Sequence, residues 1–138
     1  MKDDSKIVAE KNKEIVEEAY AEAAKGNWDG FFANFHPDCL TIVANSLPHG
    51  GTYRGPKGAR FAVNAGIGLW QEHHFEIEEL TATENRVYVY LYIMAKGKAT
   101  GETFSMPMTE VWRLRDGKVM ELRAFYFDAD RARRVYNG

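Results

Sequence analysis

One stretch near the end of the chain, residues 103–128, constrains the fold more than any other part of the sequence. It reads TFSMPMTEVWRLRDGKVMELRAFYFD, two runs rich in β-branched and aromatic residues joined at residues 115–118. Gly117 can take the positive φ that a tight turn needs. The pattern predicts a long β-hairpin, and the register of that hairpin decides which side chains face the core.

Two registers are compatible with this turn. A two-residue loop would place Glu110 opposite Arg123 and would mix charged and apolar side chains on both faces. A type I turn with a bulge at Gly117 would shift the pairing by one residue and place Glu110 opposite Leu122. We adopt the second register because it separates the two faces more cleanly. Its apolar face comprises Met106, Met108, Trp112, Met120, Leu122, Ala124 and Tyr126.

Glu110 is the one carboxylate on this apolar face. Loss of hydration there would favour the neutral form and raise the pKa of the side chain, unless a cation or several donors compensate. Buried acids of this kind are either catalytic or hydrogen-bonded structural links. We predict Glu110 as the catalytic residue, a general acid or base, and keep the structural link as the alternative.

The composition restricts the class of protein. With 138 residues, 45% of them hydrophobic, the chain is expected to form a single domain over residues 1–138. A net charge of −2 with scattered basic residues gives no indication of a nucleic-acid or membrane partner. The single cysteine, Cys39, and the spacing of the four histidines predict no metal, and the sequence indicates no cofactor. Without a long apolar run or a signal peptide, we expect a cytoplasmic protein.

Periodicity predicts helices followed by strands. Helices are expected at about 5–25, 28–35, 56–72 and 129–136, and strands at 39–44, 52–54, 75–82, 86–95, 103–114 and 119–127. This order is typical of an α+β fold, a cone-shaped curved antiparallel sheet with three N-terminal helices packed on one face. A pocket is expected between the sheet and the helices.

The strand at 86–95 has two apolar faces. Four aliphatic residues alternate with Tyr88, Tyr90 and Tyr92. One face can pack against the helices, and the other needs a second cover, which a partner subunit supplies most simply. We therefore predict a homodimer through the outer face of the sheet.

Four local patterns, in this order of elements, resemble the nuclear transport factor 2-like superfamily and, within it, the SnoaL-like and ketosteroid isomerase-like proteins. The patterns are Gly26-Asn27-Trp28-Asp29, His36-Pro37-Asp38, residues 47–55 (LPHGGTYRG) and residues 111–119 (VWRLRDGKV). The resemblance covers residues from about 8 to 136 and leaves residues 1–7 as a loose N-terminal extension. It implies a cystatin-like fold but not one activity, because the superfamily holds isomerases, cyclases, epoxide hydrolases, dehydratases and binding proteins.

The resemblance carries over to single residues only in part. Glu110 occupies the position of the protonated aspartic acid that serves the oxyanion in ketosteroid isomerase. The general base of that enzyme falls on Val43, which cannot move a proton, and its oxyanion-hole tyrosine falls nearest Tyr20. Asn45 matches an asparagine of limonene epoxide hydrolase, whose acidic set has no counterpart here. The late-strand acid or histidine of the cyclases is replaced by Leu122 and Ala124.

Two functions from different classes follow. The first is a cofactor-independent isomerase, lyase or cyclase that acts on a small apolar carbonyl or hydroxyl compound by proton transfer at Glu110. The second is a non-catalytic ligand-binding or dimeric assembly domain. In both, the predicted ligand-binding residues are Tyr20, Phe32, Val43, Asn45, Met106, Met108, Leu122, Ala124 and Tyr126.

Overall fold

The computed structural model describes residues 4–137 and confirms the predicted α+β class. The chain runs through two helices, two strands, a third helix, four long strands and a closing helix. In order, these are α1 (Asp4–Ala24), α2 (Trp28–Phe31), β1 (Phe35–Val43), β2 (Gly51–Arg54), α3 (Gly55–Ile67), β3 (Trp70–Ala82), β4 (Arg86–Gly97), β5 (Thr103–Arg115), β6 (Lys118–Tyr126) and α4 (Ala129–Asn137).

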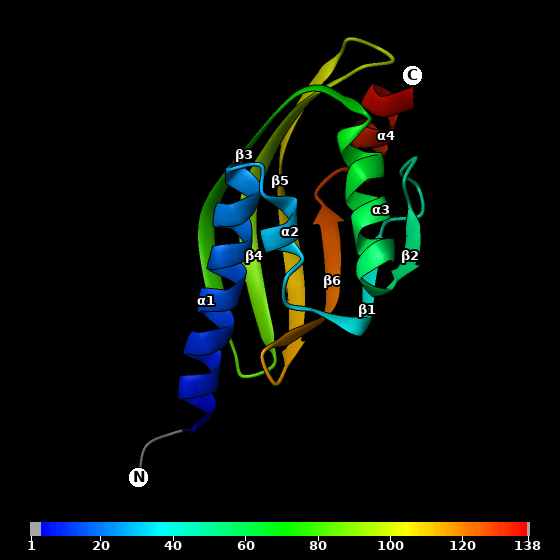
Figure 1. The fold of residues 1–138 in the computed structure, drawn as a ribbon. Coiled ribbons are helices and arrows are strands. Elements are labelled where there is room, and N and C mark those ends of the chain that lie inside the picture. Colours follow the sequence, from blue (N-terminus) through cyan, green and yellow to red (C-terminus); the bar gives the residue numbers. More distant parts are fainter. Residues whose placement is uncertain (1–3, 138) are drawn as a thin grey trace.

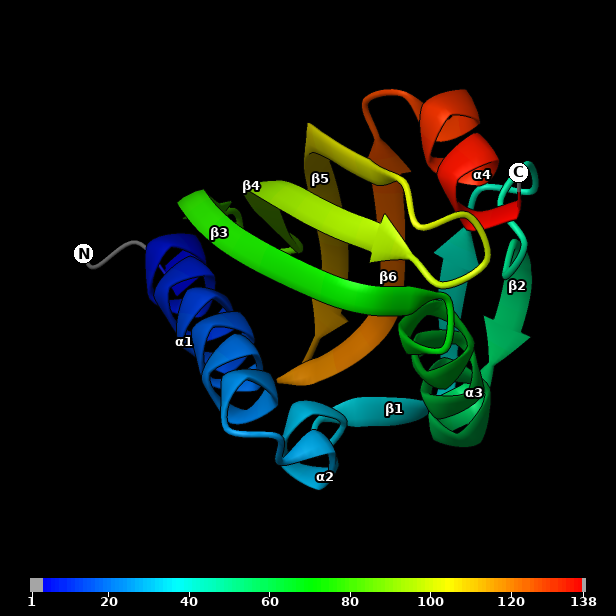
Figure 2. The ribbon, with the colours of Figure 1, turned by 90° about the horizontal axis from the view of Figure 1, so that it is seen from above.

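The six strands form one sheet in the order β2-β1-β6-β5-β4-β3. The β1–β6 pair is parallel and every other neighbouring pair is antiparallel. Helices α1, α2 and α3 lie on one face of the curved sheet (Figure 1), and β3 curls toward the space between α1 and α3 (Figure 2). In the described residues 4–137, no helix is long and apolar enough to cross a membrane.

Helix α1 is tied to the sheet near its middle and ends at a glycine. Asn12 is buried, and its side-chain amide donates to the backbone oxygens of Thr83 and Glu84 in the β3–β4 turn. Gly26 follows the helix with a φ of 79°, a C-terminal cap that only glycine adopts without strain. The helix begins at Asp4, so residues 4–7, expected to be a loose extension, are helical; residues 1–3 lie outside the described part.

Two helices end earlier in the structure than the sequence predicts. The second ends at Phe31, not residue 35, because Phe35 pairs with Val119 of β6 and begins β1. The third ends at Ile67, not residue 72, where glycines weaken it and Trp70 pairs with Gly97 of β4. In both places, pairing with a distant strand overrides the local helical pattern.

The hairpin register differs from both predicted alternatives. Asp116 and Gly117 both have positive φ values, 50° and 76°, so the turn is a two-residue loop and not a type I turn with a glycine bulge. An irregularity between Arg113 and Leu114 then shifts the strand pairing by one residue, so that Glu110 stands opposite Ala124 and not opposite Arg123. The predicted partner, Leu122, was wrong by two residues. A shift of two preserves the face of the side chains from Leu122 onward, so Glu110 still lies on the apolar face. Next to the turn the bulge changes the faces: Val119, opposite Leu114, belongs to the core cluster, and Met120, predicted on the apolar face, does not.

Candidate functional site

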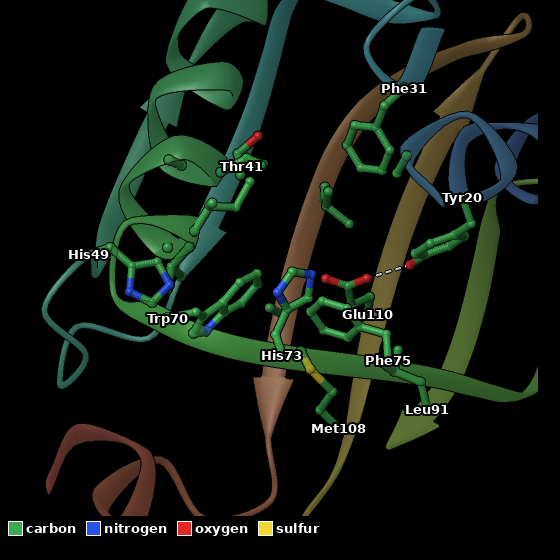
Figure 3. Close-up of a pocket in the computed structure, with 18 of the residues that line it drawn as sticks. Tyr20, Phe31, Thr41, His49, Trp70, His73, Phe75, Leu91, Met108 and Glu110 are labelled. Carbon is green, nitrogen blue, oxygen red and sulfur yellow. Dashed lines mark hydrogen bonds between the residues drawn. The ribbon is translucent and has the colours of Figure 1, made fainter. Parts of the chain in front are cut away.

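A cavity of about 520 Å³ lies between the apolar face of the sheet and helices α1–α3. This volume is in the usual range for a small-molecule site. Figure 3 shows the cavity with Tyr20 and Glu110 on the α1 side and Thr41 and His49 on the α3 side. The exposed part of its lining includes Phe75 and Ile77 of β3, which are 41% and 42% accessible, so the cavity is open to solvent along that strand.

Glu110 is held by a short chain of hydrogen bonds. The Tyr20 hydroxyl of α1 donates to Oε1 of Glu110 at 2.5 Å, and Nε1 of Trp112 donates to the Tyr20 oxygen at 3.0 Å. Trp112 is fully buried and makes edge contacts with the rings of Tyr20 and Phe31. The aromatic packing therefore fixes the tyrosine that orients the carboxyl group.

The electrostatic setting favours a neutral Glu110. Burial raises the pKa of the Glu110 carboxyl, and the hydrogen bond from Tyr20 opposes this shift. Within the described chain, Glu110 is the only acidic residue of the cavity lining, and no lysine or arginine lines it. Burial and the neighbouring Glu110 also raise the pKa of Tyr20 well above its usual value, so Tyr20 stays a hydrogen-bond donor. With Oε1 bonded to Tyr20, Oε2 has no protein partner and can exchange a proton with a ligand.

A second aromatic group lines the part of the cavity near α4. Nε1 of Trp70 donates to the hydroxyl of Tyr136 at 2.9 Å. Burial raises the pKa of Tyr126 well above its usual value, and the adjacent Tyr136 and Glu110 raise it further. These tyrosines are protonated at neutral pH and act as donors, not as bases.

The α3 side of the cavity has polar atoms without protein partners. Thr41 is 5% exposed and its Oγ1 forms no hydrogen bond, and Nδ1 of His49 is likewise buried and unpaired. His49 lies against Gly66 of α3 and near the ring of Tyr136. Burial lowers the pKa of His49, which keeps the imidazole neutral at pH 7.

The structure brings most of the predicted ligand-binding residues together around Glu110. Those that line the cavity are Tyr20, Val43, Met108, Leu122, Ala124 and Tyr126. Three others do not line it: Phe32, Asn45 and Met106. Phe31 takes the place expected for Phe32, because α2 ends there, and Asn45 is exposed in the β1–β2 loop. The sulfur of Met106 accepts a hydrogen bond from the backbone N–H of Asp128, which places it under the start of α4.

Several lining residues were missed from the sequence. Thr41 precedes Val43 by two positions in the same strand, so strand alternation could have identified it. Trp70 and His73 belong to the part of β3 that was predicted as helix and turn. Their rings stack at 4.5 Å. Among the described residues, no group of three His, Cys, Asp or Glu side chains could hold a metal ion.

The comparisons with known proteins agree with this architecture. The profile of the SnoaL-like domain matches residues 16–122, which is more than half of the chain. The chain belongs to the SnoaL-like family. Among curated proteins, no sequence match reaches significance.

Solved structures similar to this SnoaL-like domain share its fold at low sequence identity. One is a nuclear transport factor 2-like protein of unknown function from Burkholderia pseudomallei, with 18% identity and a TM-score of 0.82 over 93% of this chain and 98% of that chain. Another, assigned as a SnoaL-like polyketide cyclase, is from Jannaschia, with 18% identity and a TM-score of 0.77 over 95% of each chain. A third is TerC, co-crystallised with polyporic acid, with 19% identity and a TM-score of 0.79 over 91% and 98% of the two chains.

Proposed function

We propose that the cavity binds a small apolar carbonyl or hydroxyl compound and that Glu110 exchanges a proton with it, as in a cofactor-independent isomerase, lyase or cyclase. The observation that supports this most is the setting of Glu110: a single acid in an apolar, open cavity, with one oxygen bonded to Tyr20 and the other unpaired. A carboxyl group with a raised pKa suits proton transfer at an enolisable carbon.

The roles of the groups follow from their protonation. Tyr20 donates to Oε1 and orients the carboxyl group. When Glu110 is ionised, Oε2 receives the proton from the carbon beside the ligand carbonyl, which leaves an enolate, and later returns the proton to the ligand. Val43 lines the cavity but has no ionisable group, so Glu110 is the acid and the base in turn. One structural neighbour, assigned as a SnoaL-like polyketide cyclase, shares this fold, which is compatible with a reaction on an oxygenated compound.

The proposal is tested by hydrogen exchange on 2-tetralone, an apolar ketone with enolisable carbons. The protein is incubated with 2-tetralone in D2O, and deuterium incorporation is followed by NMR. We expect exchange above the buffer rate, with Glu110→Gln reducing the protein-dependent rate about 100-fold or more. Glu121→Gln makes the same chemical change on the outer face of β6 and should leave the rate unchanged.

Two results would change this conclusion. If 2-tetralone binds but exchanges at the buffer rate, the chain is a ligand-binding domain, which is the second candidate. If Glu110→Gln exchanges as fast as the wild type, the proton carrier is another group. The non-catalytic function is favoured by Val43, which stands where ketosteroid isomerase has its base.

We also infer that the outer face of the sheet binds a second copy of the chain. Tyr88, Tyr90 and Tyr92 are each about two-fifths exposed there, beside Phe125 at 51%. Across the same face, β3 contributes acidic side chains and β4 and β5 contribute basic ones, so a two-fold pairing can place opposite charges together. The acidic set is Glu76, Glu78 and Glu79, and the basic set is Arg86 and Arg113. Light scattering at micromolar concentration should give a dimer mass that Tyr90→Glu converts to a monomer mass; a monomeric wild type would contradict the inference.

A further inference from the structure

The proposed reaction places negative charge on the oxygen of the ligand. When Oε2 of Glu110 takes a proton from the carbon beside a carbonyl group, the C–H electron pair forms the C=C bond of an enolate and the oxygen becomes negative. Tyr20 already donates to Oε1 of Glu110, and within residues 4–137 no lysine or arginine lines the cavity. An enolate oxygen in an apolar cavity needs a hydrogen-bond donor that is in place before the reaction. The donor has to come from another side chain of the lining.

Tyr126 lies beside Glu110 on the inner face of the sheet. Tyr126 of β6 pairs with Met108 of β5, and Glu110, two residues further along β5, pairs with Ala124. Diagonal neighbours of this kind are about 7–8 Å apart, within reach of long and aromatic side chains. All four residues line the same cavity. The Glu110 carboxyl group is also close enough to raise the pKa of Tyr126. One small ligand can therefore contact both side chains.

The hydroxyl group of Tyr126 is accessible. It interacts with the hydroxyl of Tyr136, but the two groups lack the geometry of a full hydrogen bond. Among the described residues, the fully enclosed side-chain atoms without a partner are Thr41 Oγ1 and His49 Nδ1, and the Tyr126 oxygen is not one of them. The Tyr126 hydroxyl therefore keeps accessible surface on the cavity that the residue lines.

Tyr136 and Trp70 support this donor from behind. Nε1 of Trp70 can only donate, so the Tyr136 oxygen is the acceptor of their hydrogen bond of 2.9 Å. This leaves the Tyr136 hydrogen for the oxygen of its neighbour Tyr126, and Tyr126 keeps its own hydrogen for the cavity. The order of groups repeats that on the α1 side, where a tryptophan N–H donates to Tyr20 and Tyr20 donates to Glu110.

We propose that the Tyr126 hydroxyl donates a hydrogen bond to the carbonyl oxygen of the ligand and stabilises the enolate that forms there. This inference rests on the proposed function, since proton transfer to Glu110 produces the enolate. Burial, Tyr136 and Glu110 raise the pKa of Tyr126, so the hydroxyl keeps its proton and donates without ionising. When the C=C electron pair takes the proton back from Glu110, an oxygen electron pair restores the C=O bond. Tyr126 thus acts on the ligand oxygen while Glu110 acts on the carbon.

The exchange of 2-tetralone in D2O tests this role when it is measured at increasing ketone concentration. We expect Tyr126→Phe to lower kcat about 100-fold, the loss typical of one oxyanion donor, and to change KM by less than about 3-fold. Tyr88→Phe makes the same chemical change on the outer face of β4 and should keep the wild-type rate. Tetralin has the same ring system without the oxygen, and calorimetry should give it the same affinity for all three proteins.

The outcomes for the Tyr126 donor differ from those for Glu110. If the wild type exchanges 2-tetralone and Tyr126→Phe lowers kcat by less than about 10-fold, the donor role is wrong and the role of Glu110 stands. The donor role is also wrong if Tyr126→Phe weakens tetralin binding as much as it slows exchange, since the hydroxyl then supports only packing.

If the wild type does not exchange the ketone, proton transfer by Glu110 fails and the affinities for 2-tetralone and tetralin decide the donor. A wild type that binds 2-tetralone about 5-fold or more tightly than tetralin, with the difference lost in Tyr126→Phe, retains the hydrogen bond to the ligand oxygen without the reaction. Equal affinities, or a difference that Tyr126→Phe retains, overturn both proposals.

Discussion

The two ends of the cavity differ in how completely their polar atoms are paired. On the α1 side, Trp112, Tyr20 and Glu110 form a directed chain of hydrogen bonds, and buried rings hold each member in place. On the α3 side, Thr41 and His49 each have a buried atom without a protein partner. The fold itself pairs the polar atoms of the first end, whereas it leaves two buried atoms of the second end without a partner.

The difference affects the stability of the free protein. A carboxyl group oriented by a fixed donor keeps its geometry before a ligand arrives, which is what proton transfer requires. An unpaired hydroxyl or imidazole instead costs stability in the free protein. Tyr20→Phe and Thr41→Val should therefore have opposite effects on stability.

The largest effect is expected at Tyr20. Tyr20→Phe removes the donor to Glu110 Oε1 and the acceptor of Trp112 Nε1, which should lower the free energy of unfolding by about 1.5–3 kcal/mol. It should also raise the pKa of Glu110 further, because the Tyr20 hydrogen bond lowers it. Urea denaturation at pH 7 and a carboxyl NMR titration measure the two effects. The exposed Tyr88→Phe is the control; an equal loss in both variants would show that the chain from Trp112 to Glu110 adds nothing.

Glu110→Gln should change stability in a pH-dependent direction. The pKa of Glu110 is raised in the folded protein, so its contribution is most favourable below the ordinary carboxyl pKa of about 4.3 and is lost as pH rises through the folded value. Above that value the wild type holds a poorly solvated charge that glutamine lacks. The variant should be more stable than the wild type at pH 8, on the order of 1 kcal/mol, and the difference should shrink toward pH 4. Thermal unfolding across this range would show a constant difference if Glu110 were well solvated.

Thr41→Val should stabilise the free protein by about 1 kcal/mol, since it removes a buried hydroxyl group without a partner and keeps the shape of the side chain. Thr109→Val on the opposite face should change stability by less than about 0.5 kcal/mol. Chemical denaturation without ligand measures both. A destabilised Thr41→Val would mean that the hydroxyl group is satisfied in the free protein, and the contrast between the two ends would disappear.

The smallest effect is expected at His49. Its pKa is lowered in the folded state, so the stability it contributes is complete above the ordinary histidine value of about 6.5 and is lost as pH falls toward the folded value. His49→Phe should therefore lose less stability than the wild type between pH 7 and pH 5, by a few tenths of a kcal/mol. His73→Phe, at an exposed position of β3, is the matched control. A parallel decline of all three proteins would contradict a buried, neutral His49.

Much of the fold could be predicted because it depends on local pattern. Alternating side chains define the long strands, Gly26 ends the first helix, and Pro56 begins the third. The predicted boundaries failed where a distant strand competes for the backbone. Phe35 pairs with Val119, and Trp70 pairs with Gly97, although both lie in segments with helical character. Such pairings involve residues far apart in the chain, and no local window contains them.

The sequence by itself determined that Glu110 faces the core, because strand alternation has a period of two and any register that buries Met108 and Trp112 also turns Glu110 inward. It did not determine the partner of Glu110 across the hairpin, since a bulge shifts pairing without a clear sequence signal. Only the tertiary structure brought Tyr20 from α1 to the carboxyl group and enclosed Thr41 and His49 without partners. Hydrogen bonds between separate elements depend on how those elements pack, and packing is a property of the whole chain.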